Sequence, residues 1–411
     1  MKPIPLNVDG ANPLGFLAAV GVVQLLSEKR AEKDAPDVRL SWTESRTPVV
    51  LAQGVEDGAA LVGLIADLAT HGAPGQAEVE AEKRAQAAWR AARKKADEKA
   101  KEIKQRRLPR DHRKAALEAE HAPLAEEVRK RRAEWRISRA KAAPDLAVSM
   151  GLDLNVTSEE FSRHCCDALD ASTPTSRRWV DFCASFGAAN ARNRIDATPF
   201  SLISGSGQQW FLDTAGKLMV ECSVEHFRKA LLGSWVAEDD LYSFRWDPDD
   251  DRRYALLADD PTASGNKPKT IWGANRLAFE ALRLFPCMRG RTGPATVGWR
   301  YDGESDVWRW PLWACNLSPA VISSVLASRD IWRDDPDSRR RLRARGVFAV
   351  FQTRRITVGR PPNQKINFTP SVPVWWSTVA KSQHGQGPAQ QQHAADGAAR
   401  RRRCRALCNP R

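Results

Sequence analysis

The residues with the strongest chemical potential in this 411-residue chain are basic, and they gather in two segments. Residues 76–142 contain 21 Lys and Arg against 12 Asp and Glu, and residues 382–411 contain six Arg against one Asp. Because the whole chain has a formal net charge of +14, the remaining residues are neutral in sum. Positive charge on the appendages of a neutral body is typical of contacts with nucleic acid phosphates.

Two clusters in residues 76–142 and a few residues elsewhere are candidate nucleic-acid contacts. In the basic segment the candidates are Arg93, Lys94, Lys95, Lys99, Lys101, Lys104, Arg106 and Arg107, followed by Arg129, Lys130, Arg131 and Arg132. In the rest of the chain they are Asn275, Arg276, Arg291, Arg354 and Arg355. The alternative for the basic segment is a solvated coiled-coil spacer, and the alternative for the other residues is a surface or structural ion pair.

Patterns of known catalytic sites are missing from the sequence. It contains no GxxxxGK[ST], HExxH or GxSxG motif and no zinc-spaced Cys/His set. The acidic run 247–251 does not fit a calcium loop, because Arg252 stands where that loop needs Gly and Ala258 where it needs Glu. We therefore expect no catalytic residue, metal or cofactor, and interpret Asp247–Pro248 as a turn.

The apolar segment Leu14–Leu26 near the N-terminus predicts a buried helix. It is shorter than the roughly 20 apolar residues of a membrane span, and it lacks the flanks of a signal peptide. Asn12 is a favourable N-cap and Pro13 a favourable first helical residue. Gly15 and Gly21 suit close backbone packing. With eight scattered cysteines, which are typical of a reducing compartment, the segment favours a cytoplasmic protein without a membrane partner.

The composition divides the chain into four parts. We expect an N-terminal α+β part of a body at residues 1–75, a basic helical hairpin at 76–142, the α+β remainder of the body at 143–376, and a disordered basic tail at 377–411. The tail is either a native binding segment or a non-native end. The fold class is α+β, with antiparallel strands, buried helices and a projecting hairpin. Most of the fifteen tryptophans should anchor the core or an interface.

The hairpin is expected from helix-forming composition rather than from an apolar stripe. Its Ala, Glu, Lys and Arg content predicts a long helix over residues 77–107 and another over 124–141, with a short helix between them. The sequences LPRD at 108–111 and HAP at 121–123 should interrupt the helices. Because these helices have little apolar surface to bury, we expect them to project from the body.

Several segments of the body resemble one family. The segments are GANPLGFLAAVGVVQLL followed by VRLSW, RWDPDDDRRYALLADDP followed by WGANRLAFEALRLFP, and then WPLW, RGVFAVFQTRRITVG and FTPSVP. They are similar to the large-subunit-like proteins of type I CRISPR surveillance (Cascade) complexes of the I-G branch, formerly I-U. The resemblance covers roughly residues 1–60 and 240–375, and it includes neither the hairpin nor the tail.

The resemblance implies a non-enzymatic protein. Such subunits bind the guide RNA complex with its backbone and repeat-processing subunits, recognise the short motif that flanks the target in double-stranded DNA, and help to open the duplex. They then support recruitment of a separate helicase-nuclease. Guide pairing reads the sequence, and protein supplies short-motif and backbone contacts. No family motif assigns a flanking-motif reader to a numbered residue here.

Two other functions remain as alternatives. A metal-dependent nuclease of a defence system would use the carboxylates of residues 247–251. A protein-interaction scaffold would use the hairpin to bind another coiled helix.

Overall fold

The fold is mixed α+β, as expected, and its sheets are antiparallel. The computed structural model describes residues 1–28, 37–173, 177–203, 209–250, 269–291, 293–358 and 365–377. By their contacts, Met1–Ser377 form one unit. The predicted tail lies outside the described residues except for Ser377.

Two antiparallel sheets contain the main strand pairings. The first has the order β1-β3-β2 and consists of β1 (Ile4–Pro5), β2 (Val38–Trp42) and β3 (Pro48–Ala52). The second has the order β10-β11-β12-β13, and β14 also pairs with β12. Its strands are β10 (Trp299–Tyr301), β11 (Asp306–Trp313), β12 (Val347–Val358), β13 (Lys365–Phe368) and β14 (Val372–Trp376). β2 pairs with β3, and β10 pairs with β11, as antiparallel hairpins.

Short elements connect these sheets to the helices. The small two-stranded pairs are β4 (Gly187–Ala189) with β5 (Ile195–Ala197), β6 (Asp239–Asp240) with β7 (Lys269–Thr270), and β8 (Cys287–Arg289) with β9 (Pro294–Thr296). Further helices of the described residues are α6 (Ser158–Asp170), α7 (Arg178–Phe186), α12 (Pro319–Leu326) and α13 (Pro336–Ala344).

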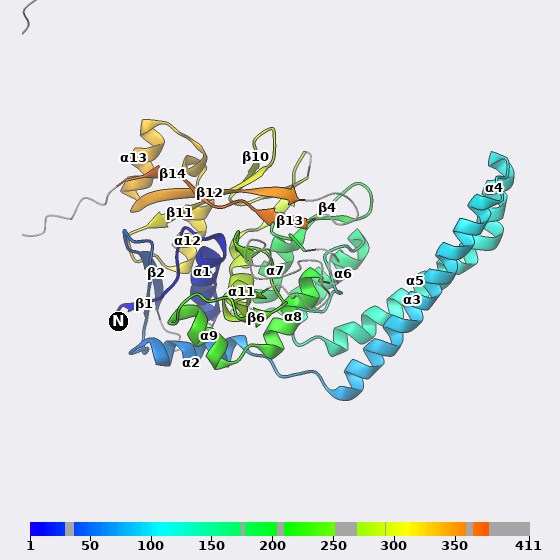
Figure 1. The fold of residues 1–411 in the computed structure, drawn as a ribbon, viewed down its shortest axis with the longest axis horizontal. Coiled ribbons are helices and arrows are strands. Elements are labelled where there is room, and N and C mark those ends of the chain that lie inside the picture. The colour runs from blue at the N-terminus through cyan, green and yellow to red at the C-terminus, as the bar shows by residue number, and fades with distance from the viewer. Residues whose placement is uncertain are drawn as a thin grey trace, which may run out of the picture. The chain divides into compact units, whose positions relative to one another are not determined.

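Two helices form the centre of the body. Figure 1 shows α1 (Pro13–Glu28) and α11 (Trp272–Ala281) next to each other beneath the five-stranded sheet, with α2 (Gly58–Ala69), α8 (Phe211–Glu221) and α9 (Val224–Leu231) on their other side. Residues far apart in the chain thus share one core. The segments before and after the basic hairpin are parts of one body.

An aromatic cluster joins α1 to both sheets. Phe16 of α1 stacks on Trp42 of β2 with ring centroids 5.6 Å apart, and its ring also contacts Trp308, Trp310 and Trp313 of β11. The indole N–H of Trp310 donates to the Gly10 carbonyl, and that of Trp313 donates to the Leu40 carbonyl. These tryptophans are core anchors, as their number in the sequence suggested.

The basic segment forms two long helices that lie side by side (Figure 1). They are α3 (Gln76–Gln105) and α5 (Ala122–Ala142), and α4 (Arg110–Ala116) joins them. The predicted interruption at residues 121–123 is wrong. A π-helical turn at Leu117–His121 carries the chain from α4 into α5, and Pro123 lies in the first turn of α5.

The N-terminal helix begins at the predicted cap and is buried, as the sequence predicted. The Asn12 side chain accepts hydrogen bonds from the backbone N–H groups of Leu14 and Gly15, and every residue from Pro13 to Leu26 is buried. A Cβ at Gly21 would lie 1.8 Å from the Leu277 carbonyl oxygen, so glycine is what allows α1 and α11 to approach.

We expect Gly21→Ala to lower the free energy of unfolding by roughly 1–3 kcal/mol or more, because the two central helices must separate to admit the methyl group. Gly63→Ala is the matched control. No atom lies within 4 Å of a Cβ at Gly63 in α2, so better helix propensity should stabilise that variant by up to about 1 kcal/mol. Urea unfolding measures both changes. Equal stability of the two variants would show that α1 and α11 do not pack backbone to backbone.

Candidate nucleic-acid interface

Stacked tryptophans and ion pairs hold the two helices of the hairpin together. The rings of Trp89 in α3 and Trp135 in α5 are parallel, with an interplanar angle of 3° and centroids 4.9 Å apart. The Trp135 indole N–H donates to the Glu82 carboxylate at 2.7 Å. Farther along, Lys99 of α3 and Arg106, which follows this helix, both contact Glu120 of the π-helical turn. The hairpin therefore has apolar and ionic contacts of its own, although its helices bury few residues.

More than half of the predicted hairpin cations have an acidic partner. Arg93 and Lys94 lie 3.7 and 3.9 Å from the carboxylates of Asp97 and Glu98, one helical turn onward. The remaining paired cations are Lys99, Arg106, Arg129, Arg131 and Arg132. These ion pairs are mostly exposed and therefore weak. Each of these cations can thus release its carboxylate partner and bind a phosphate instead.

The other predicted hairpin cations have no such partner. Lys95, Lys101, Lys104, Arg107 and Lys130 are all exposed, and none of them has an ion pair in the part of the chain that the structure describes. The Lys104 and Arg107 side chains lie near the junction with α4, which has no buried residue. The hairpin thus presents uncompensated positive charge to solvent.

Two of the predicted arginines of the body meet at one cleft. Arg291, which follows β8, and Arg355 of β12 line a cleft of about 540 Å³ together with Arg300 of β10 and the exposed Tyr301. Asp306 of β11 lies 3.5 Å from Arg355 in the same cleft. The neighbouring Arg354 does not join them, because consecutive residues of a strand point to opposite faces. It contacts Asp302 at 2.5 Å and donates to the Ser305 hydroxyl.

An arginine cluster that the sequence analysis missed adjoins this cleft. Arg300 and Arg309 each place a guanidinium carbon 4.9 Å from the ring centroid of Trp332. Burial and the positive charges of Arg329 and Arg333 lower the pKa of Arg300. Arg300, Arg329 and Arg333 have no ion pair among the described residues. The sequence signal was RDIWR, in which Arg329 and Arg333 flank the tryptophan.

Asn275 and Arg276, in contrast, are not at a surface. Both side chains are 0% exposed in α11. Asn275 accepts from the Phe244 backbone N–H and donates to Thr270 and Ile271. The expectation that these two residues contact nucleic acid is wrong, because the helix that carries them is enclosed on all sides.

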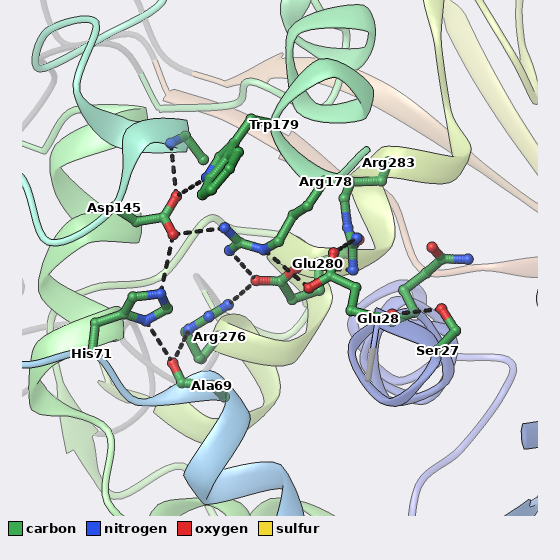
Figure 2. Close-up of polar contacts among 12 residues, drawn as sticks. Ser27, Glu28, Ala69, His71, Asp145, Arg178, Trp179, Arg276, Glu280 and Arg283 are labelled. Carbon is green, nitrogen blue, oxygen red and sulfur yellow. Dashed lines mark hydrogen bonds and ion pairs between the residues drawn. The ribbon is translucent and has the colours of Figure 1, made fainter. Parts of the chain in front are cut away.

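Arg276 belongs to a buried ionic network, drawn in Figure 2. It donates to the Glu280 carboxylate at 2.8 Å and to the Ala69 carbonyl at 3.0 Å. Arg178 of α7 contacts the same Glu280 oxygen at 2.8 Å. Arg283 contacts both Glu280 and Glu28 of α1. Three arginines therefore surround one fully buried carboxylate, and they tie α1, α7 and α11 together.

The network also holds both ends of the hairpin. His71, which precedes α3, lies 3.1 Å from the Asp145 carboxylate, which follows α5 (Figure 2). Arg178 donates to Asp145 at 2.6 Å, and Trp179 donates to its other oxygen. The chain thus enters and leaves the hairpin at one point, where charged side chains fix it to the body.

Burial and charge act against each other on these carboxyl groups. Burial by itself would raise the pKa of Glu280, but the charges of Arg178, Arg276 and Arg283 outweigh it and hold that pKa well below its usual range. In the same way, the His71 hydrogen bond and the Arg178 charge outweigh burial and lower the pKa of Asp145. For Glu28 burial prevails and raises the pKa to about 7.

The carboxylates of the acidic run have structural partners. Asp247 accepts from the Asn12 side chain and from the Asp249 backbone N–H, and Asp250 accepts from the Ser243 hydroxyl. Asp251 lies outside the described residues. Where the structure is described, no three His, Cys, Asp or Glu side chains come together in a way that could hold a metal ion.

Each helix in the described ranges is too short or too polar to span a membrane.

Comparison with known proteins adds no further assignment. Neither a protein-family model, nor a curated protein, nor a solved structure matches this chain.

We expect Glu280→Gln to lower the free energy of unfolding by about 3–5 kcal/mol, because it leaves three buried arginines without their shared counter-charge. Glu225→Gln in α9 removes an exposed ion pair with Arg228 and should cost less than about 1 kcal/mol.

The pH dependence should also change. The pKa of Glu280 is lower in the folded chain than in the unfolded chain, so its contribution is present above about pH 4.5 and is lost on further acidification. The free energy of unfolding should therefore fall less on acidification in Glu280→Gln than in the wild type. Parallel acid profiles would contradict the assignment.

Proposed function

We propose that this chain is a non-enzymatic, nucleic-acid-binding subunit of a type I CRISPR effector complex. In the cytoplasm it associates with the guide RNA complex and its backbone and repeat-processing subunits. It contacts double-stranded target DNA next to the flanking motif, helps to open the duplex, and supports a separate helicase-nuclease. The hairpin supplies phosphate contacts, and the arginine cleft of the body supplies a second basic surface.

One observation carries the nucleic-acid part of this proposal. The exposed hairpin cations Lys95, Lys101, Lys104, Arg107 and Lys130 have no acidic partner in the described chain, although acidic residues are frequent in both helices. Unpaired surface cations along a rigid pair of helices suit the regular phosphates of a nucleic acid.

The arginine cleft gives independent support. Arg291, Arg300 and Arg355 line it, and Arg329 and Arg333 lie close enough to Arg300 to lower its pKa. Guanidinium groups bind phosphate oxygens with two parallel hydrogen bonds, which makes arginine suited to nucleic-acid recognition.

The assignment to a CRISPR complex depends on the resemblance alone. The segments that resemble the family include the central helices α1 and α11 and the strands β11 and β12 of the large sheet. They are therefore parts of the body, and the basic hairpin is an addition to them.

A second candidate function is a protein-interaction scaffold. The contacts of Lys99 and Arg106 with Glu120 connect the helices of the hairpin through their own charges. A hairpin stabilised in this way could serve as a spacer or bind another helix without any nucleic acid.

Binding of duplex DNA over a salt series tests the proposal. We expect the full-length protein to bind with an affinity that falls steeply with salt, and Lys95→Glu/Lys104→Glu to weaken binding at least about tenfold and to reduce the salt slope by about 2. Arg228→Glu/Lys229→Glu in α9 makes the same change in formal charge at exposed positions of the body and should retain the wild-type slope. Equal losses in both variants, or no binding by the wild type, would favour the scaffold.

A further inference from the structure

A cleft of about 590 Å³ lies where α3 and α5 meet residues 150–156. Its volume is in the range of roughly 300–1,000 Å³ that is usual for sites of small ligands. We call it the hairpin-base cleft. It is separate from the arginine cleft, which is lined by residues of β9, β10, β11 and β12 and by Arg291.

The walls of the hairpin-base cleft are fixed by hydrogen bonds. Arg136 of α5 donates to the Met150 carbonyl at 3.3 Å, and Arg132 donates to the Asn155 carbonyl at 3.5 Å. Both arginines also contact Glu160 of α6. The loop of residues 150–156 is thus attached to α5 at two places, so the cleft has a defined width between this loop and α3.

One part of the cleft is aromatic and apolar. Trp89 and Trp135 line it as a parallel stack, and Trp135 is held by its hydrogen bond to the buried Glu82. The guanidinium carbon of Arg93 lies over the Trp89 ring, 6.0 Å from its centroid, at the outer limit of a cation–π contact. Trp210, just before α8, completes the aromatic lining, together with Met150 and Leu152.

The rim of the cleft is predominantly basic. Six cationic side chains line it, namely Arg90, Arg93, Lys94, Lys101, Arg132 and Arg136, against the acidic residues Asp97, Glu98 and Asp153. Arg90 and Lys101 are exposed and have no ion pair in the described part of the chain. Burial lowers the pKa of Arg136, and the positive charges of Arg132 and Arg163 lower it further despite the ion pair with Glu160. The lining thus carries more positive than negative charge, which favours an anion.

An aromatic wall next to cations matches the two halves of a nucleotide. Bases stack on aromatic side chains whatever their sequence, and phosphates bind the surrounding cations. A base paired within a duplex cannot enter such a cleft, because its faces are covered by its neighbours in the stack. An unpaired base can be turned outward and inserted.

We propose that the hairpin-base cleft holds an unpaired nucleotide of a single nucleic acid strand. The base lies in the part formed by Trp89, Trp210 and Leu152, and the adjoining phosphates contact Arg90 and Lys101. This inference rests on the proposed function and deepens it, since it assigns single-stranded nucleic acid to the base of a hairpin whose outer cations contact phosphates.

The test uses the full-length protein and short oligonucleotides that contain one 2-aminopurine, whose fluorescence falls when the base stacks. The same sequence is titrated as single-stranded DNA, as single-stranded RNA and as duplex DNA. We expect quenching at saturating protein with one or both single strands and little with the duplex, and the two single-stranded arms show which sugar the cleft accepts.

Two variants test the cleft itself. Trp210→Ala should weaken single-strand binding by about tenfold, the effect of losing one base–aromatic stack, and should reduce the quenching. Arg90→Glu/Lys101→Glu should weaken it at least as much, and it alters exposed residues, so folding is retained. Lys95→Glu/Lys104→Glu is the matched control, because it also reverses two charges on α3 but at positions outside the cleft. This control should bind more weakly yet still quench fully at saturation.

The outcomes separate this inference from the proposed function. Nucleic-acid binding without quenching, or equal quenching in the cleft variants and the control, would overturn the hairpin-base cleft as a nucleotide site and leave the phosphate contacts intact. Absence of binding to every oligonucleotide would overturn both.

Discussion

The arrangement of the body depends on a single buried carboxylate. Glu280 is 0% exposed, and Arg178, Arg276 and Arg283 converge on it from α7, α11 and the turn that follows α11. Each of these charges would be costly to bury alone, so each requires the others in place. Because Glu28 at the end of α1 contacts Arg178 and Arg283, the orientation of the N-terminal helix is tied to the same group.

The same network explains how a hairpin with little apolar surface is positioned. His71 and Asp145 bring the two ends of the hairpin together, and Arg178 connects Asp145 to Glu280. The hairpin is therefore oriented from its base rather than along its length. Such an arrangement leaves the outer cations exposed while the Trp89–Trp135 stack and the residues around it remain close to the body.

The cations of this chain differ in whether an acidic residue lies beside them. Several cations of the hairpin, among them Arg93, Lys94, Arg129 and Arg131, have an acidic partner one turn away, as is common on solvated helices. The hairpin cations without an ion pair and the arginines around Trp332 lack such partners among the described residues. These two groups occupy two separate surfaces of the protein. A nucleic acid that contacts both surfaces would have to span the body between them, which is consistent with the proposed role beside a long guide–target duplex.

The sequence by itself determined the local elements. Asn12 and Pro13 specified the start of α1, and composition specified α3 and α5, because each signal acts within a few residues. Only the tertiary structure decided which charges are available. Arg276 and Arg291 look alike in sequence, yet one is enclosed with Glu280 and the other lines an open cleft. Arg300 and Arg309 reach Trp332 through long-range packing, and the tryptophans that line the hairpin-base cleft are brought together in the same way; no local pattern records these contacts.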